Sequence, residues 1–172
     1  MYLSVGSGST RYKDTLNLDM CELHNVDIVA DARKIPFENE YFDGIIACHV
    51  VEHFRKNEHI PLLMEWRRVI KPSGKIYICV PNFLKCIKYY LENKRGLRYE
   101  YWEQTIFGLY RNEGDEHKSG ITEQYLTELL FKTGFVDLKW AEDMSIEYEH
   151  NIEVIAIKGN VKINEDNKVW QL

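Results

Sequence analysis

Two glycines and two aspartates follow successive apolar stretches near the start of the chain. Gly6 and Gly8 come directly after a short apolar stretch, and Asp19 and Asp31 each end another one. Glycine lacks a Cβ, so a turn with two glycines can adopt left-handed backbone angles and lets a ligand approach the main chain. A carboxylate can accept hydrogen bonds from both hydroxyls of a ribose. These residue types at this spacing predict one pocket for a nucleotide-like ligand.

The apolar stretches predict the strands of an open, mostly parallel sheet. Ligands of such sheets bind beyond the carboxyl ends of the strands, where loops and helix N-termini converge, and both aspartates occupy such ends. The last two stretches follow one another closely and are expected to pair antiparallel at the edge of the sheet. The predicted strands cover residues 3–5, 16–19, 26–31, 42–48, 75–80, 135–141 and 152–158.

The connection after the glycine turn is unusually short. Ser9 to Asp14 cannot hold the crossover helix of about ten residues or more that joins parallel strands. We therefore expect a tight loop or a single turn there. Asp19 consequently comes sooner than the acid that follows the glycine turn of dinucleotide sites by about 20 residues.

Three later segments have helical features. The first spans about residues 60–70, and Arg67, Arg68 and Lys71 at its C-terminal end are expected on a solvated face. The second begins after Asn82 and the third after Thr122, because both residue types cap helix N-termini. The expected apolar face of the second helix consists of Phe83, Leu84, Ile87 and Leu91.

Length and composition predict one globular domain. The chain has 172 residues, of which 45% are hydrophobic and 13% aromatic, enough for a sizeable core. We assign residues 1–158 to this domain and residues 159–172 to a polar tail. An aromatic-rich insertion at about 93–120 suits a lid or a substrate-facing surface.

Charge, cysteines and hydropathy exclude several classes of protein. The net charge of −5 argues against a protein that mainly grips nucleic acid. The four cysteines form no C-x-x-C pair, which favours a reducing, cytoplasmic compartment. No apolar run reaches 18 residues and no basic, apolar leader is visible, so we expect neither a membrane span nor a signal peptide.

Short motifs follow one another along most of the chain: Val5-Gly6-Ser7-Gly8, Asn17-Leu18-Asp19, Val26 to Ala32, Ile35-Pro36-Phe37, Tyr41-Phe42-Asp43, His49 to Phe54, Glu65 to Gly74, Ile106-Phe107-Gly108 and Asp115 to Gly120. In order and spacing they resemble class I S-adenosylmethionine-dependent methyltransferases, and most closely the small members of the type 11 group. The resemblance covers roughly residues 2–158. It implies an α/β, Rossmann-like, doubly wound and mostly parallel sheet with an antiparallel C-terminal edge, in a minimal version with a shortened first crossover.

The resemblance also implies which residues bind the cofactor. Gly6, Ser7 and Gly8 would pass under the methionine and ribose of S-adenosylmethionine, and Asp19 would accept hydrogen bonds from the ribose hydroxyls. The chain departs from the family pattern at Thr10, where a third glycine would stand. The helix that usually follows the glycine turn is expected to be lost.

The adenine and the reacting methyl group fall to later motifs. Asp31 would accept a hydrogen bond from the adenine amino group, the Ala32 amide would donate to a ring nitrogen, and His49 would lie near the sulfonium. Methyl transfer mainly requires that nucleophile, methyl carbon and sulfur be aligned. A hydroxyl nucleophile also needs a base, and a neutral histidine suits that role. His117 is our first candidate for it and His49 the second.

We therefore expect an enzyme that transfers a methyl group from S-adenosylmethionine and leaves S-adenosylhomocysteine. The aromatic insertion and the lack of helices over the pocket favour a small-molecule or bulky glycan acceptor, such as a hydroxyl of a surface-polymer precursor. A second copy of the chain could complete the exposed mouth of the pocket. No metal ion is expected.

Three other interpretations remain open. His49-Val50-Val51-Glu52-His53 fits the H-x-x-E-H pattern of inverted zinc proteases, which would need a third ligand on a later helix. A nicotinamide-dependent oxidoreductase would have its third glycine where Arg11 stands. A catalytically weak or inactive methyltransferase-like module would serve as a scaffold, and its biological activity would survive the loss of Asp19.

Overall fold

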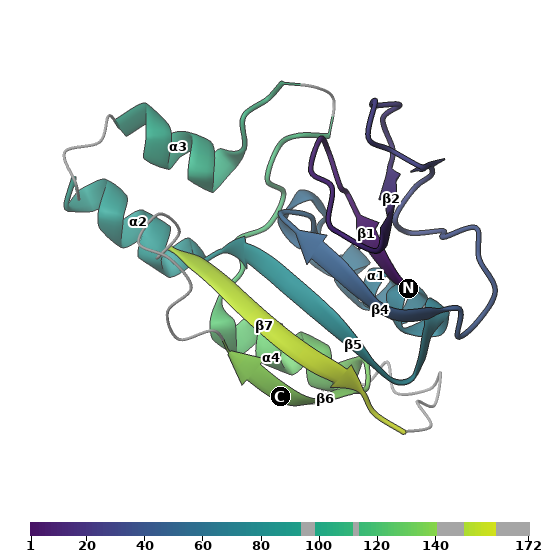
Figure 1. Ribbon diagram of the computed structural model, residues 1–172. Coiled ribbons are helices and arrows are strands. Elements are labelled where there is room, and N and C mark those ends of the chain that lie inside the picture. Colours follow the sequence, from purple (N-terminus) through teal and green to yellow (C-terminus); the bar gives the residue numbers. More distant parts are fainter. Residues whose placement is uncertain (94–98, 112–113, 141–149, 161–172) are drawn as a thin grey trace.

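The computed structural model describes residues 1–93, 99–111, 114–140 and 150–160. These residues form one mixed sheet with strands β1 (Tyr2–Val5), β2 (Thr15–Asp19), β3 (Ile28–Val29), β4 (Phe42–Cys48), β5 (Ile70–Pro81), β6 (Phe135–Trp140) and β7 (Asn151–Lys158). The strand order is β3-β2-β1-β4-β5-β7-β6 (Figure 1). β7 pairs antiparallel with both β5 and β6, whereas the first five strands pair in parallel. The predicted parallel sheet with an antiparallel C-terminal edge is confirmed.

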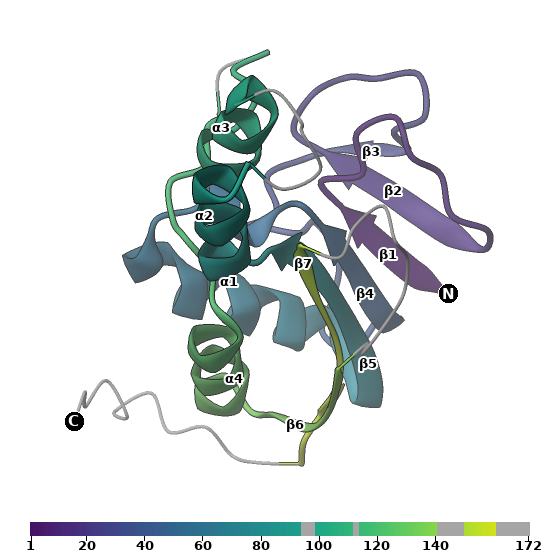
Figure 2. The ribbon, with the colours of Figure 1, turned by 90° about the vertical axis from the view of Figure 1, so that its left-hand side faces the viewer.

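The helices are α1 (Lys56–Val69), α2 (Phe83–Leu91), α3 (Tyr99–Phe107) and α4 (Glu123–Lys132), with a 3₁₀ turn, η1, at Val51–His53. Figure 2 shows α1, α2 and α4 on the same face of the sheet. Two predicted caps are present. The Asn82 side chain accepts a hydrogen bond from the Lys85 amide, and the Thr122 hydroxyl accepts one from the Tyr125 amide.

The short first crossover is confirmed. Residues 6–14 are all described and contain no helix. Side-chain amides hold this loop instead. The buried Asn17 amide donates to the Thr10 carbonyl at 2.9 Å and to the Asn25 carbonyl at 3.0 Å, and the Asn25 amide donates to the Ser9 carbonyl at 2.7 Å. These bonds satisfy loop carbonyls that a helix would otherwise pair.

Side chains of α1 anchor the segment between β3 and β4. The Trp66 indole donates to the Ala32 carbonyl at 3.0 Å, and the Arg68 guanidinium donates to the carbonyls of Ile35 and Phe37. The predicted solvated face is wrong for Arg67, which is buried and donates to a backbone carbonyl of the C-terminal segment, whereas Arg68 is half-buried and Lys71 is exposed. Side-chain donors add hydrogen bonds to the carbonyls of this loop, and a guanidinium supplies five N–H groups.

The expected apolar face of α2 is also partly wrong. Leu84 and Leu91 are exposed, whereas Cys86 and Tyr89 are buried. The physical reason is α3, which packs beside α2 (Figure 1) and places the ring of Trp102 5.3 Å from that of Tyr89. The position of α3 therefore determines which side of α2 is buried.

α3 lies within the aromatic-rich insertion predicted at 93–120. Its Trp102 is buried, but the exposed large side chains in this region are Tyr99, Tyr101, Phe107, Leu109 and Tyr110. Residues 94–98 and 112–113 of the insertion, and residues 161–172 of the predicted tail, lie outside the described part. The division of the chain into domain, insertion and tail stays a prediction.

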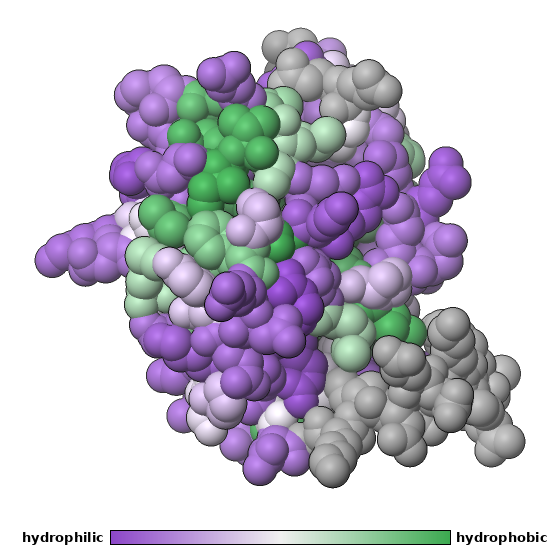
Figure 3. All heavy atoms as spheres, turned by 90° about the vertical axis from the view of Figure 1, so that its right-hand side faces the viewer, coloured by the Kyte–Doolittle hydropathy of each residue, from purple (hydrophilic) through white to green (hydrophobic). Residues whose placement is uncertain are grey.

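The side of the molecule that carries β1, β2 and β3 has apolar surface. Figure 3 looks onto this side and shows hydrophobic patches between polar ones. Met20, Leu23 and Val29 are exposed hydrophobic residues of the segment that contains β3. None of the described helices is both long enough and apolar enough to cross a membrane.

Trp66→Phe tests the anchoring of the segment between β3 and β4. The substitution keeps an aromatic ring but leaves the buried Ala32 carbonyl without its donor, which should lower the free energy of unfolding by about 1–3 kcal/mol. Urea denaturation measures this loss. Trp140→Phe, at a half-buried site on β6, is the matched control and should cost clearly less. Equal losses in the two variants would contradict the anchoring role.

Candidate functional site

The glycine turn lies at the carboxyl end of β1 and has the predicted conformation. Gly6 and Gly8 have φ angles of +56° and +54°, which side chains rarely allow. A Cβ on Gly6 would lie 2.7 Å from Cγ2 of Val50, whereas a Cβ on Gly8 would meet nothing within 4 Å. Gly6 is therefore required by packing, and Gly8 borders open space where a ligand can approach the backbone.

Asp19, at the carboxyl end of β2, is bonded to this turn. Its Oδ2 accepts a hydrogen bond from the Gly8 amide at 2.8 Å, and its Oδ1 accepts one from the Cys21 amide at 2.9 Å. Each carboxylate oxygen keeps capacity for a further donor such as a ribose hydroxyl. The Ser7 hydroxyl is buried and has no hydrogen-bond partner among the described residues. The orphaned hydroxyl, the room at Gly8 and the spare acceptors fit the methionine and ribose parts of S-adenosylmethionine.

Asp31 follows β3 as expected, but its carboxylate already has a partner. Arg33 donates to Asp31 through Nη2 at 2.6 Å and also through Nε, and its Nη1 reaches Glu58 at 3.0 Å. The hydrogen bond from Arg33 lowers the pKa of Asp31. Ala32 beside it is buried. An adenine amino group would have to share Asp31 with Arg33, so the adenine contacts of Asp31 and Ala32 stay predictions.

His49 directly follows β4 and forms a pair with a buried acid. Its φ angle is +55°, which is uncommon for a residue other than glycine. Its Nδ1 lies 3.2 Å from Oε1 of Glu52, whose side chain is 2% exposed, while the His49 side chain is 44% exposed. Burial lowers the pKa of His49, but the hydrogen bond and charge of Glu52 outweigh burial and raise it. Glu52 thus holds His49 with its outer edge toward solvent.

His117, predicted as the first candidate base, lies in the same cluster. Its ring is 4.9 Å from that of His53 in an edge-to-face arrangement, and it is half-buried. Burial lowers the pKa of His117. The His117 loop is fastened to η1, because the Glu52 carbonyl accepts hydrogen bonds from the amides of Lys118 at 2.8 Å and Ser119 at 3.1 Å. The fold therefore brings together His49, Glu52, His53 and His117.

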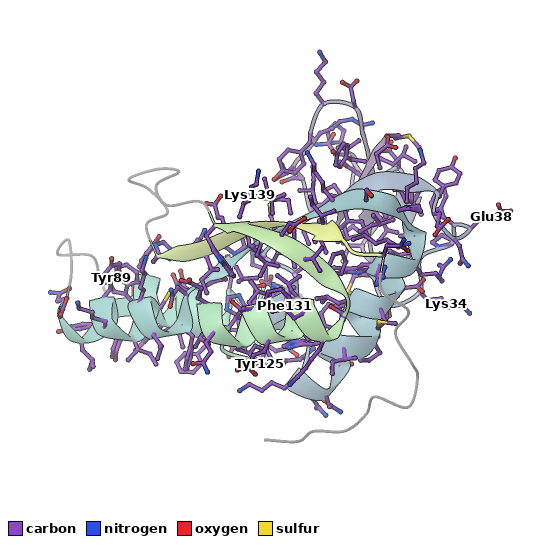
Figure 4. All side chains as sticks on the ribbon, turned by 90° about the horizontal axis from the view of Figure 1, so that it is seen from below. Lys34, Glu38, Tyr89, Tyr125, Phe131 and Lys139 are labelled. Carbon is purple, nitrogen blue, oxygen red and sulfur yellow. The ribbon has the colours of Figure 1, made fainter. Side chains whose placement is uncertain are left out.

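His59, which the sequence patterns did not single out, supports this cluster from α1. It is fully buried, and its Nδ1 lies 2.8 Å from the hydroxyl of Tyr125, which projects from α4 (Figure 4). Its Nε2 lies 3.1 Å from the Val51 carbonyl and 3.2 Å from the Ser119 hydroxyl. His59 thus connects η1, α4 and the loop that carries His117. The only signal in the sequence that could have pointed to His59 is its short distance from the H-x-x-E-H motif.

The zinc-protease interpretation fails at its geometric requirement. Its two histidines must lie one turn apart on a helix, but His49 precedes η1, and η1 is a 3₁₀ turn of three residues. Among the residues that the structure describes, the potential ligand atoms that do lie within 4.8 Å of one another belong to Glu52, His53 and His117. The third member comes from a loop between α3 and α4 rather than from a later helix.

A small pocket adjoins His117 on the side of α2 and α3. Its lining residues include Phe83, Cys86, Thr105, Ile106, His117 and Ile121. The exposed aromatic side chains of α3 and the residues after it belong to the same part of the chain as Thr105 and Ile106. This hollow has room for little more than a water molecule, so it marks a side from which His117 can be approached and not a site for a whole acceptor.

Comparison with known proteins agrees with this fold. The type 11 family model described as "Methyltransferase domain" matches residues 12–78. A search of the curated proteins finds no match. Among solved structures, a SAM-dependent methyltransferase from Archaeoglobus fulgidus is 18% identical with a TM-score of 0.61, and the alignment covers 91% of this chain and 85% of that one.

Two further solved structures have the same fold. A SAM-dependent methyltransferase from Methanosarcina mazei has a TM-score of 0.59 at 16% identity, covering 92% of each chain. The 1,6-didemethyltoxoflavin-N1-methyltransferase of Burkholderia thailandensis, solved with 1,6-didemethyltoxoflavin and S-adenosylhomocysteine, has a TM-score of 0.60 at 15% identity, covering 92% of this chain and 71% of that one. The strand order is therefore that of the class I methyltransferase fold, and residues 12–78, which include Asp19, match the type 11 methyltransferase model.

Proposed function

We propose that the chain methylates a hydroxyl oxygen of a bulky acceptor, such as a glycan or another surface-polymer precursor. The observation that carries this proposal is the pair of His49 with buried Glu52 at the end of β4. β4 lies beside β1, with Ala47 opposite Val5, and Val50 packs against Gly6 of the turn. His49 is therefore close in the fold to the residues that fit the cofactor.

A hydroxyl acceptor explains why a histidine–carboxylate pair would stand there. S-adenosylmethionine supplies an activated methyl group on a sulfonium, so the chain need only align the acceptor and take up its proton. A hydrogen bond from Nδ1 of His49 to Glu52 keeps the proton on Nδ1 and leaves Nε2 with a free lone pair. That nitrogen can accept the hydroxyl proton as the oxygen bonds to the methyl carbon.

The geometry supports His49 rather than His117 as the base. His49 is more exposed and is oriented by Glu52, whereas His117 is half-buried and has its pKa lowered by burial. We therefore propose His49 as the base. His117 contributes to the acceptor side, because it lines the pocket beside α2 and α3.

The acceptor class is supported by the exposed aromatic side chains of the segment that also contributes Thr105 and Ile106 to that pocket. Exposed aromatic residues on α3 and directly after it, among them Tyr101, Phe107 and Tyr110, offer flat apolar surface with polar tips. Such a surface suits a bulky ring-containing acceptor, and the net charge of −5 disfavours nucleic acid. We also expect the chain to work in the reducing cytoplasm, since its four cysteines are unpaired, and a second copy could complete the pocket mouth.

A methylation screen tests the proposal. The purified chain is incubated with methyl-labelled S-adenosylmethionine and a panel of nucleotide-activated sugars and oligosaccharides. Release of S-adenosylhomocysteine together with one added methyl group on an acceptor oxygen, located by NMR, is the expected result. A chain that binds neither S-adenosylmethionine nor S-adenosylhomocysteine in calorimetry would favour the scaffold interpretation instead.

Asp19→Asn should weaken S-adenosylhomocysteine binding by about 10- to 100-fold, because hydrogen bonds to a charged carboxylate contribute about 1.5–3 kcal/mol. Isothermal titration calorimetry measures the affinity. The control is Asp27→Asn. The Asp27 carboxylate also accepts a hydrogen bond from a backbone amide, that of Asn17 at 2.8 Å, but Asp27 precedes β3 and does not end a strand. An equal loss of affinity in both variants would refute the ribose assignment.

His49→Gln should reduce turnover on the acceptor found in the screen by at least about 100-fold, the lower end of what a general base contributes. Its affinity for S-adenosylhomocysteine should stay near that of the parent, because the lost group serves the acceptor. His24→Gln replaces an exposed histidine between β2 and β3 and should keep full turnover. Undiminished turnover in His49→Gln would exclude His49 as the base.

A further inference from the structure

We infer that Glu52, His53 and His117 form a binding site for one divalent transition-metal ion of the zinc type. Each residue offers one ligand atom, and the three atoms lie within 4.8 Å of one another. Two imidazole nitrogens and one carboxylate oxygen form a ligand set found in zinc enzymes. Three separate features of these side chains support the assignment.

The first feature is the carboxylate. Glu52 is 2% exposed, and only one of its oxygens is engaged, Oε1 with His49. Oε2 is buried and has no hydrogen-bond partner within the described ranges. A buried carboxylate oxygen without a partner is costly, since it has lost its hydration and gained nothing in return. A cation bound at Oε2 would compensate that cost and leave the bond to His49 intact.

The second feature is the orientation of the two imidazoles. Nδ1 of His53 lies 3.2 Å from the Glu116 carbonyl. A carbonyl only accepts, so Nδ1 carries the proton and the lone pair is on Nε2. The His117 ring packs edge-to-face against the His53 ring, with the two centroids 4.9 Å apart. Metal-binding histidines commonly donate one ring N–H to a carbonyl or carboxylate, which fixes the tautomer and presents the other nitrogen to the ion.

The third feature is how the chain holds the ligands. Glu52 and His53 are neighbours in η1, and 63 residues separate His53 from Glu116. Two backbone hydrogen bonds from Lys118 and Ser119 to the Glu52 carbonyl, and the bridge through His59, fix the His117 loop against η1. Ligands on a rigid support bind an ion without a large ordering cost.

The ligand set selects the ion and suggests its use. Imidazole nitrogens favour Zn²⁺ or Co²⁺, whereas Mg²⁺ prefers oxygen ligands. Three protein ligands leave a fourth position, as in catalytic zinc sites. This use rests on the proposed function: an acceptor hydroxyl at that position would lose its proton to Nε2 of His49 more readily. Its oxygen would then bond to the methyl carbon, and the carbon–sulfur bond would break with its electron pair passing to sulfur.

Metal titration of the full chain tests the site. Protein stripped with EDTA should bind one Zn²⁺ per chain in calorimetry and give no heat with Mg²⁺. Co²⁺ should produce the visible absorption bands of a low-coordinate nitrogen–oxygen site. Absence of stoichiometric Zn²⁺ binding would overturn the inference.

Variants locate the ion. His53→Ala and His117→Ala should each weaken Zn²⁺ binding by about 100-fold or more, beyond the 10- to 100-fold typical of losing an outer partner. Glu52→Gln should weaken binding as well. His24→Ala, the exposed control, should bind Zn²⁺ like the parent. Parent-like Zn²⁺ affinity in His53→Ala and His117→Ala, or an equal loss in His24→Ala, would refute the assignment.

Cofactor binding measured on the same samples separates this inference from the proposed function. Retained S-adenosylhomocysteine affinity in the variants shows that they are folded. Zn²⁺ binding by a parent chain that does not bind S-adenosylhomocysteine would support the metal site and contradict the proposed function. S-adenosylhomocysteine binding without any Zn²⁺ binding would overturn the metal site alone.

Discussion

The site depends on the contacts of Glu52, which are made by its buried carboxylate and by its backbone carbonyl. The carboxylate orients His49 through one oxygen, and the backbone carbonyl accepts hydrogen bonds from two backbone amides of the His117 loop. A charge with 2% exposure requires partners, because burial removes its hydration. The segment after β4, the 3₁₀ turn and the distant loop are therefore arranged around one residue.

Side-chain hydrogen bonds also stabilise the segments that connect strands without a helix. Without a helix after the glycine turn, loop carbonyls would remain unpaired, and Asn17 and Asn25 supply the missing donors. On the other side of the site, Trp66 and Arg68 of α1 perform this task for the segment that contains Ala32. The strand ends that fit the cofactor are thus held in place in a small chain, because side chains donate the hydrogen bonds that the backbone of a helix would otherwise make.

Errors in the pattern-based expectations have a common cause. Helical periodicity identified the residues of α2 that share a face, but α3 determined which face was covered, and Leu84 and Leu91 remained outside. Charge suggested that Arg67 and Arg68 were solvated, yet both donate to backbone carbonyls. Local patterns do not encode the partner that an element will meet.

The sequence by itself determined the strands, the caps at Asn82 and Thr122, the shortened crossover and the glycine turn followed by Asp19, because each depends on residues near one another in the chain. It identified His49 and His117 as separate candidates. Only the tertiary structure decided that Glu52 is buried between them and that His53 and His117 meet. The physical reason is that their contact depends on backbone hydrogen bonds between η1 and a loop far along the chain, which no local spacing specifies.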